Sequence, residues 1–241
     1  MKKYSILTLS RFHDQLERLI KSILVAQPDI SLNDIYVVDD GLPDDFKEKW
    51  KGINYILGEQ PFIFARNFNI GLKSIPIDRD LFFIGDDAVL LTLKGIDRLA
   101  ETAYNNSKIG MAGTSVNGAV GNYYQKFGVL QHPTTREELR KLDYYHPTLM
   151  FVAVYLKREL IDVVGDIPES LVGYGFEDNY YSLQMAKLNY TWIIDPTVVV
   201  FHGWGEYSAG SSFYRRGLNP VEMIEVNRKI FKEISEDADQ N

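Results

Sequence analysis

The first half of the chain alternates short hydrophobic segments with segments of helical periodicity, and this alternation restricts the fold more than any other feature. The hydrophobic segments are rich in β-branched or aromatic residues, as buried strands are: 4–10, 35–38, 53–57 and 81–84. Between the first two, hydrophobic residues recur at helical spacing from Leu16 to Leu24, and Asp14 is the expected N-cap. The alternation predicts an α/β fold with a mostly parallel central sheet flanked by helices.

The pattern continues into the second half with less regularity. Further helices are predicted at 64–73, 96–103, 160–164, 177–188 and near the C-terminus, and further strands at 109–112, 149–155, 192–194 and 197–201. Segment 118–130 indicates a hairpin or irregular loop, and the polar segment 134–141 a short surface helix. Because no repeat or linker divides the chain, we expect one domain over 1–241, with a smaller sheet or loop region in its second half.

Composition narrows the classes of function. A formal net charge of −7 and a pI near 5.2 argue against general binding to nucleic acid or to an anionic membrane. The chain has no cysteine, so it can form neither a disulfide nor a thiolate metal site, which fits a reducing compartment. The start is too short and polar for a signal sequence, and no window reaches the roughly 18 apolar residues of a membrane helix. We therefore expect a cytoplasmic protein without an integral membrane segment.

Polar residues gather where three of the predicted strands end. They are Thr8, Ser10 and Arg11 after the first strand, Asp39 and Asp40 after the second, and Asp86 and Asp87 after the fourth. Because parallel strands end at the same edge of a sheet, these clusters are expected to meet at one cleft. A single aspartate in such a place is as easily a loop carboxylate or a helix cap. Three clusters on one edge favour a binding site.

The acidic pair Asp86-Asp87 points to a bound cation, since two adjacent carboxylates repel each other unless a cation lies between them. Without cysteine, the site is expected to prefer Mg²⁺ or Mn²⁺. His202 follows the last predicted strand, and a neutral imidazole beside carboxylates would favour Mn²⁺. Taken alone, a histidine at a strand end is more often a hydrogen-bonded residue than a ligand.

A third polar group follows the glycines of Gly173-Tyr174-Gly175, which allow a sharp turn or a close approach to a ligand. Glu177 and Asp178 stand at the start of a predicted helix, where negative charge favours the helix dipole. A carboxylate in that place can also act as a general base. The residues alone leave both interpretations open.

The motifs of the chain come in a fixed order: Thr8-Leu9-Ser10-Arg11, 37–41, 64–72, 82–87, 175–179 and 200–202. In order and spacing this set resembles family 2 glycosyltransferases and their relatives, from Tyr4 to His202. The resemblance implies a GT-A fold and the metal-dependent transfer of a sugar from a nucleotide-diphosphate-sugar, expected to be a UDP-sugar, to an acceptor hydroxyl with inversion. It divides the single domain into a nucleotide-sugar-binding half (1–115), an acceptor and catalytic half (116–205), and a lid loop with a C-terminal helix (206–241).

The resemblance also implies a role for each matching residue. On the donor side, Thr8, Ser10 and Arg11 would line the nucleotide pocket, Asp39 would hold the base or ribose with Asp40 beside it, and Arg66 and Asn69 would lie near the nucleotide. Asp87 matches the last acid of the D-x-D motif and would bind Mn²⁺ or Mg²⁺ with His202. The first position of that motif is here Gly85, a departure, and Asp86 would assist through ribose or water.

Two further roles follow from the resemblance. Asp178 matches the catalytic base, and Glu177 is the second choice. The segment from Gly203 to Gly217 suits a lid over the donor, from which Arg215 or Arg216 would fold onto the diphosphate. Ordinary surface charge is the alternative explanation for these two arginines.

Other classes of protein fit less well. A nucleotidyltransferase is expected to carry a loop rich in glycine and lysine where this chain has Ser10-Arg11-Phe12-His13, and the dinucleotide motif G-x-G-x-x-G is absent there. A binding module without activity would be expected to lose acids or the histidine that this chain retains. The acceptor could be a saccharide, a lipid-linked carrier or another hydroxyl compound, and the acidic charge makes a nucleic acid the least expected.

Overall fold

The computed structural model describes residues 3–129, 148–203 and 215–237. The first part of the chain forms β1 (Tyr4–Ser10), α1 (His13–Ala26), β2 (Ile35–Asp39), α2 (Asp44–Lys49), β3 (Asn54–Leu57), α3 (Phe64–Ser74) and β4 (Asp80–Ile84). It continues as β5 (Ala88–Leu90), α4 (Gly95–Tyr104), β6 (Ile109–Gly118), β7 (Ala153–Leu156), α6 (Arg158–Val164), α7 (Glu177–Lys187), β8 (Thr191–His202) and α9 (Pro220–Asp237). The predicted helix at 134–141 and most of the predicted lid lie outside these residues.

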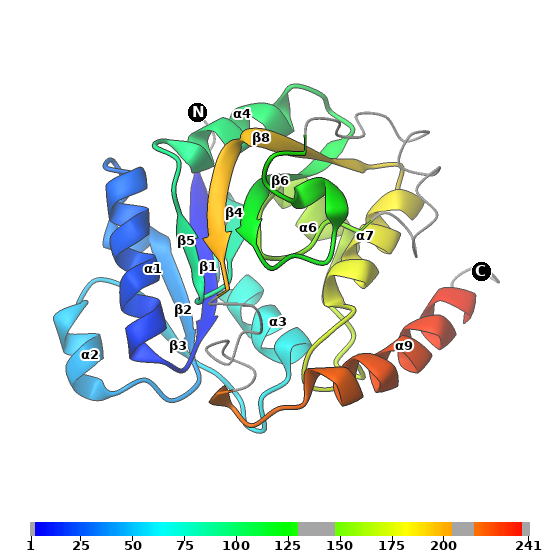
Figure 1. Cartoon of the computed structure of the whole chain (residues 1–241), viewed down its shortest axis with the longest axis horizontal. Helices are drawn as coiled ribbons and strands as arrows, with labels where there is room; N and C mark the ends of the chain where they lie inside the picture. The colour runs from blue at the N-terminus through cyan, green and yellow to red at the C-terminus, as the bar shows by residue number, and fades with distance from the viewer. Residues whose placement is uncertain (1–2, 130–147, 204–214, 238–241) are drawn as a thin grey trace.

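The described strands form one eight-stranded sheet in the order β3-β2-β1-β4-β7-β6-β8-β5 (Figure 1). Pairing is parallel between β3, β2, β1 and β4, and again between β6 and β8. β7 runs antiparallel to both of its neighbours, and β5 runs antiparallel to β8. The α/β fold with a mostly parallel sheet is therefore confirmed: four of the seven pairs between described strands are parallel, and the second-half strands join the first-half ones in the same sheet.

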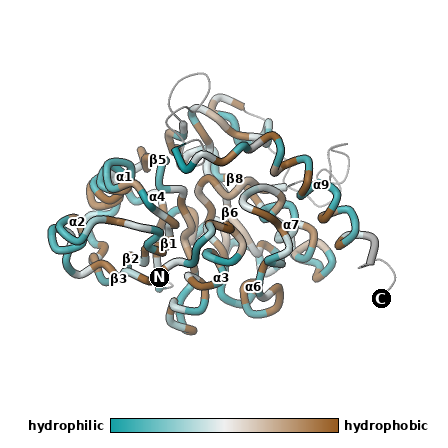
Figure 2. Tube along the Cα trace, turned by 90° about the horizontal axis from the view of Figure 1, so that it is seen from below, coloured by the Kyte–Doolittle hydropathy of each residue, from teal (hydrophilic) through white to brown (hydrophobic). Residues whose placement is uncertain are grey.

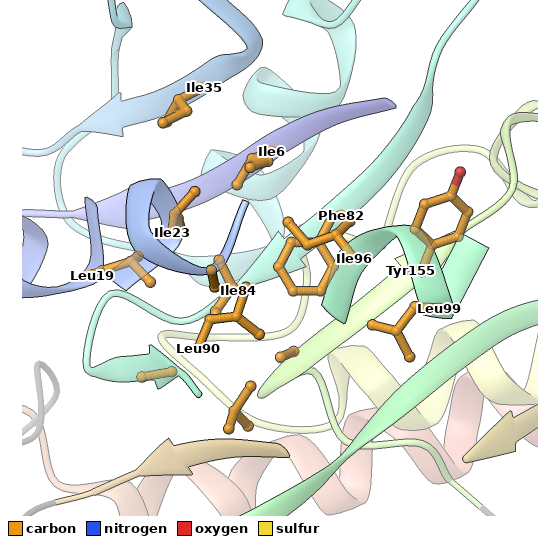
Figure 3. Close-up of a cluster of buried hydrophobic side chains, with 14 of the residues drawn as sticks. Ile6, Leu19, Ile23, Ile35, Phe82, Ile84, Leu90, Ile96, Leu99 and Tyr155 are labelled. Atoms are coloured by element: carbon orange, nitrogen blue, oxygen red, sulfur yellow. The ribbon is translucent and has the colours of Figure 1, made fainter. Parts of the chain in front are cut away.

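Two hydrophobic clusters cover the two faces of the sheet, as alternation along each strand requires. Ile6 belongs to the cluster under α1 and α4, whereas its neighbour Leu7 belongs to the cluster under α3, α6 and α7. Figure 3 shows Ile6 between side chains from α1, β4 and α4. In Figure 2 the acidic and basic helix α2 is mostly hydrophilic, consistent with its place at the periphery. The sheet is thus a buried layer between two helical layers.

Two details differ from the sequence-based expectation. Phe12, not Asp14, occupies the N-cap of α1, and Asp14 lies in the first turn, where its charge still favours the helix dipole. The two strands predicted at 192–194 and 197–201 are one strand, β8, with an irregular register opposite Thr114 and Ser115. Pro196 lies in that irregular stretch, and a proline cannot donate to the ladder, so the sequence pattern there resembles a break.

The short elements α2 and β5 were not predicted. Three residues of β5 are too few for a periodic pattern, and the strand exists because it pairs with β8. This pairing matters for the site, since it places Ala88 opposite His202. In the described parts of the chain, no helix has the length and apolar character needed to span a membrane.

Candidate active site

A cleft of about 540 Å³ opens at the carboxyl edge of the sheet. Its walls come from the turn after β4, the end of β6, the segment before β7, and the loop that leads into α7. The polar residues that line it are Asp86, Asp87, Lys126, Glu177, Asp178, His202 and Arg216. Asp86 and Asp87 therefore share one cleft with Glu177 and Asp178, whereas the polar residues at the ends of β1 and β2 are not among the residues that line it.

Much of the remaining wall is apolar and aromatic. Phe62, Phe64, Phe83 and Phe151 line the cleft together with Tyr174. Phe64 packs edge-on against Phe83 at 5.7 Å and against Tyr174 at 6.0 Å between ring centroids. No sequence pattern distinguishes these phenylalanines, because an aromatic residue in a hydrophobic segment has the same pattern whether it lines a cleft or fills a core.

The turn after β4 presents Asp86 and Asp87 side by side, both nearly buried. Ser10 at the end of β1 donates a hydrogen bond of 2.8 Å to Asp86 Oδ2. A Cβ on Gly85 would lie 3.2 Å from Asp87 Oδ1, so a side chain at this position would crowd the carboxylate. This contact gives a physical reason for glycine at the first position of the acidic motif.

His202 reaches Asp87 because β5 pairs with the end of β8, and its Nε2 lies 3.4 Å from Asp87 Oδ1. Its Nδ1 faces the carbonyl oxygen of Ala119, an acceptor for Nδ1–H, so Nε2 faces Asp87 either with a proton that it donates or, in the neutral ring, with a lone pair open to a cation. Burial opposes protonation of the ring, but the hydrogen bond and charge of Asp87 outweigh it and raise the pKa of His202. A position that attracts a proton between a carboxylate and an imidazole also attracts a cation.

The pair Asp87 and His202 fits a divalent ion as a partial ligand set. A carboxylate oxygen and a neutral imidazole nitrogen suit Mn²⁺, and Mg²⁺ accepts the carboxylate with water and phosphate oxygens. Among residues 3–129, 148–203 and 215–237, no group of three or more histidine, aspartate or glutamate side chains is arranged to hold an ion. A bound substrate and water would therefore have to supply the remaining ligands.

Glu177 and Asp178 begin α7 after a tight loop in which Gly173, Gly175 and Phe176 all have positive φ. Glu177 is buried and accepts a 2.7 Å hydrogen bond from the Gly175 N–H. Burial raises the pKa of Glu177 to about 8, with a smaller contribution from the charge of Asp178. Asp178 is half-buried, and desolvation raises its pKa to about 6. The two acids thus differ in protonation near neutral pH.

Asp39 and Asp40, at the carboxyl end of β2, do not line the cleft themselves. Asp39 accepts hydrogen bonds from the N–H groups of Gly41 and Leu42 and forms an ion pair with Lys47 at 3.1 Å. This is the geometry of a loop carboxylate that stabilises the turn after β2. Asp40 forms a buried ion pair with Arg216, which does line the cleft.

The arginines after the predicted lid occupy different places. Arg215 forms an ion pair with Asp14 at 2.9 Å and stacks over Phe12, outside the cleft lining. The Arg216 guanidinium lies 4.1 Å from the centre of the Phe62 ring. Burial, and then the charge of Arg11, lowers the pKa of Arg216 to about 10. Of the two arginines, Arg216 is the one that the fold brings to the site.

The other expected donor-side residues lie outside the cleft lining. Thr8 is buried at the end of β1, and its hydroxyl has no hydrogen-bond partner among the described residues. Arg66 pairs with Glu59 at 3.3 Å. Both ends of the buried Asn69 amide bond to the backbone of Ile167, at 2.8 and 2.9 Å. Asn69 therefore holds a loop in place.

Comparison with known proteins identifies the fold. No protein-family model matches the chain, and no curated protein matches it in sequence. The structure resembles that of GalNAc-T7 with UDP, GalNAc and Mn²⁺, with a TM-score of 0.68 and 16% identity over 85% of this chain and 44% of that one. It also resembles the mannosyltransferase PcManGT from Pyrobaculum calidifontis in complex with GDP-Man and Mn²⁺, with a TM-score of 0.62 and 15% identity over 86% of this chain and 59% of that one.

The chain spans about half the length of these two structures. At such low identity the likeness concerns the fold, and it extends over most of this chain. The chain has the GT-A glycosyltransferase fold.

Proposed function

We propose that this protein is a metal-dependent glycosyltransferase related to family 2 enzymes, which transfers a sugar from a nucleotide-diphosphate-sugar to an acceptor hydroxyl. The observation that carries the proposal is the meeting of two acidic groups in one cleft. Asp87 and His202 supply a partial ligand set for a cation, while Glu177 and Asp178 supply carboxyl groups with raised pKa values. Both of the solved structures that this chain resembles contain Mn²⁺ together with a nucleotide or a nucleotide sugar.

Asp87 and His202 would hold Mn²⁺ or Mg²⁺, with Asp86 supporting the turn through its bond from Ser10. When bound, such an ion supplies Lewis-acid neutralisation of the negative charge that grows on the leaving nucleoside diphosphate. Arg216 is the arginine that we propose for the diphosphate, because its guanidinium lines the cleft. It would exchange its partner Asp40 for phosphate oxygens.

Asp178 is the catalytic base in this proposal. With a pKa of about 6 it is mostly ionised near neutral pH, whereas Glu177, with a pKa of about 8, is mostly protonated. The Asp178 carboxylate would take the proton of the acceptor hydroxyl as the hydroxyl oxygen forms a bond to the anomeric carbon. The bond from that carbon to the phosphate oxygen breaks in the same displacement, so the sugar inverts its configuration.

The donor is proposed to be a UDP-sugar that extends from the cleft over the carboxyl ends of β1 and β2. The buried Thr8 hydroxyl there has no hydrogen-bond partner in the described parts of the chain, and Arg11, Asp39 and Asp40 lie at the same strand ends. Arg66, Asn69 and Arg215 would act on the donor only indirectly in the observed arrangement, through Glu59, Ile167 and Asp14. The aromatic wall suits the apolar face of a sugar ring in a saccharide or lipid-linked acceptor.

A thermal-shift screen of nucleotide sugars, each with and without MnCl₂, tests the proposal. We expect one nucleoside-diphosphate class to raise the melting temperature only when the metal is present, because metal and diphosphate complete each other's contacts. Release of the nucleoside diphosphate would then be followed with that donor. If no nucleotide sugar raises the melting temperature in either condition, the proposal is wrong. Stabilisation without any turnover would favour a binding module instead.

A further inference from the structure

The loop at 172–176 leads into Glu177 and the proposed base Asp178, and its backbone conformation is one that the chain does not favour by itself. Gly173, Gly175 and Phe176 have φ values of +60°, +114° and +76°, in the left-handed region that side-chain-bearing residues rarely adopt. Such conformations persist only where surrounding groups impose them. The groups that impose this one are distant in the sequence.

The main anchor is Asn227, in the middle of α9 (red in Figure 1) and fully buried. Its Nδ2 lies 2.9, 3.2 and 2.9 Å from the carbonyl oxygens of Val172, Tyr174 and Gly175, so its two N–H groups are shared among three acceptors. Its Oδ1 accepts from the Val172 N–H at 2.8 Å. One amide side chain thus satisfies four backbone groups of a loop that lies more than fifty positions earlier in the chain.

These bonds lead directly to the acids. The carbonyl of Tyr174 and the N–H of Gly175 belong to the same planar peptide group, so they point in opposite directions. Asn227 holds the carbonyl end, and the N–H end donates to Glu177 Oε2 at 2.7 Å. This one peptide group therefore connects Asn227 to Glu177, the residue before Asp178 at the start of α7.

The rest of α9 reinforces this contact. A Cβ on Gly173 would lie 2.1 Å from Met223 Sδ, and one on Gly175 would lie 3.2 Å from Ile224 Cγ1. The rings of Phe176 and Phe231 pack at 5.3 Å between centroids. On the other side, the N–H of Phe64 at the start of α3 donates to the Gly173 carbonyl at 2.7 Å. The loop is clamped between α3 and α9.

We propose that Asn227 is a positioning residue for the reaction: it fixes the loop at 172–176 so that Asp178 meets the acceptor hydroxyl. This inference rests on the proposed function. Asn227 touches none of the residues that would hold the metal, so it should affect turnover rather than donor binding. Misplacing a reacting group by about 1 Å can cost about 100-fold in rate.

The test compares Asn227→Asp with Asn219→Ala in the full chain. Aspartate has the size of asparagine and keeps the acceptor for the Val172 N–H, but it cannot donate to the three carbonyls. Asn219 accepts from the N–H groups of Val221 and Glu222 at the start of the same helix, so its loss weakens α9 without touching the loop. For each variant, donor dissociation constants with Mn²⁺, kcat for donor hydrolysis or transfer, and amide hydrogen exchange of 172–178 are measured.

We expect Asn227→Asp to lower kcat at least tenfold, to change the donor dissociation constant less than threefold, and to speed exchange in 172–178. Asn219→Ala should stay within threefold of the parent in all three measurements. A parent-like kcat in Asn227→Asp, or a loss of donor affinity equal to the loss of kcat, would overturn the inference. If the parent protein neither binds nor turns over a nucleotide sugar, the proposed function fails instead, while the exchange data still decide whether Asn227 holds the loop.

A second pair of variants covers the case in which Asn227→Asp does not fold. Gly173→Ala should push the loop away from α9 because its Cβ meets Met223 Sδ, and it should lower kcat in the same way. Adding Met223→Ala makes room for that Cβ, so the double variant should recover part of the lost kcat. A double variant no faster than Gly173→Ala alone would mean that the positive φ at this position, and not contact with α9, causes the loss of kcat, and would overturn the inference.

Discussion

The two acidic pairs of the cleft differ in how their charge is held. Asp86 and Asp87 lie in the turn after β4, where Ser10 donates to the first and the His202 ring faces the second. Glu177 and Asp178 lie after a loop with positive φ values, and burial raises the pKa of both. The first pair lies where a cation can bind beside it. The carboxyl groups of the second pair bind a proton more tightly than exposed carboxyl groups do.

This difference follows from what each pair is attached to. The turn after β4 is fixed by central strands of the sheet, which are buried on both faces, so its carboxylates are positioned by the most stable part of the fold. The loop before α7 depends on a helix at the end of the chain through Asn227. The proposed metal ligands and the proposed base therefore depend on different parts of the fold, and we expect them to respond differently to mutation.

The largest effect is expected at the metal side. Asp87→Ala removes the carboxylate that faces His202 and should abolish metal-dependent donor binding, with transfer falling by ~10³-fold or more because stabilisation of the leaving diphosphate is lost. Titration calorimetry of the donor with and without Mn²⁺ measures this loss, and a chelator should reproduce it in the parent. Ser10→Ala removes only the bond to Asp86 and should cost a few-fold. Equal losses in the two variants would mean that Asp87 has no special role.

At the base side, Asp178→Asn should lower kcat by about 10²–10⁴-fold while donor binding stays close to that of the parent, because general-base catalysis is lost and the metal side is untouched. Single-turnover kinetics with the identified donor separate the two quantities. Glu177→Gln is the matched control, and it should retain much more activity. If Asp178→Asn turns over normally and Glu177→Gln does not, the base is Glu177.

The smallest effect concerns stability and pH. Glu177 has a pKa raised from 4.5 to about 8 in the folded protein, so the folded state binds its proton more tightly than the unfolded state. Its contribution to stability is complete below pH 4.5 and is lost as the pH rises through about 8. Glu177→Gln cannot ionise and should show no such loss.

The parent and the Glu177→Gln variant should therefore melt at similar temperatures below about pH 4.5 and diverge progressively as the pH rises to about 8. One pKa unit corresponds to about 1.4 kcal/mol, and 1 kcal/mol shifts the melting temperature of a domain this size by about 2–4 °C. Differential scanning calorimetry above the pKa of Glu177 should thus find the parent lower by at least ~5 °C. Parallel melting curves across the whole pH range would mean that Glu177 is not buried as a neutral acid.

Sequence reasoning located the acids well because their positions follow from local pattern. Asp86 and Asp87 come directly after a hydrophobic strand, and a parallel arrangement places strand ends on one edge. The start of α7 at Glu177 and the end of β8 at His202 were likewise visible as changes in periodicity. By contrast, the antiparallel direction of β7 and the three-residue strand β5 could not be predicted from the sequence, since both depend on pairing with strands far along the chain.

The α/β framework and the kinds of residues at the ends of its strands follow from the sequence alone, because hydrophobic periodicity and strand-end chemistry are local. Which of those residues share the cleft depends on the tertiary structure. In the folded chain Asp39 accepts hydrogen bonds within the turn after β2, and Arg216 rather than Arg215 lines the cleft. The loop before α7 forms hydrogen bonds with Asn227. The physical reason is that hydrogen bonds and ion pairs between distant segments leave no period in the sequence: a buried asparagine in a helix has the same local pattern whether or not it holds a loop.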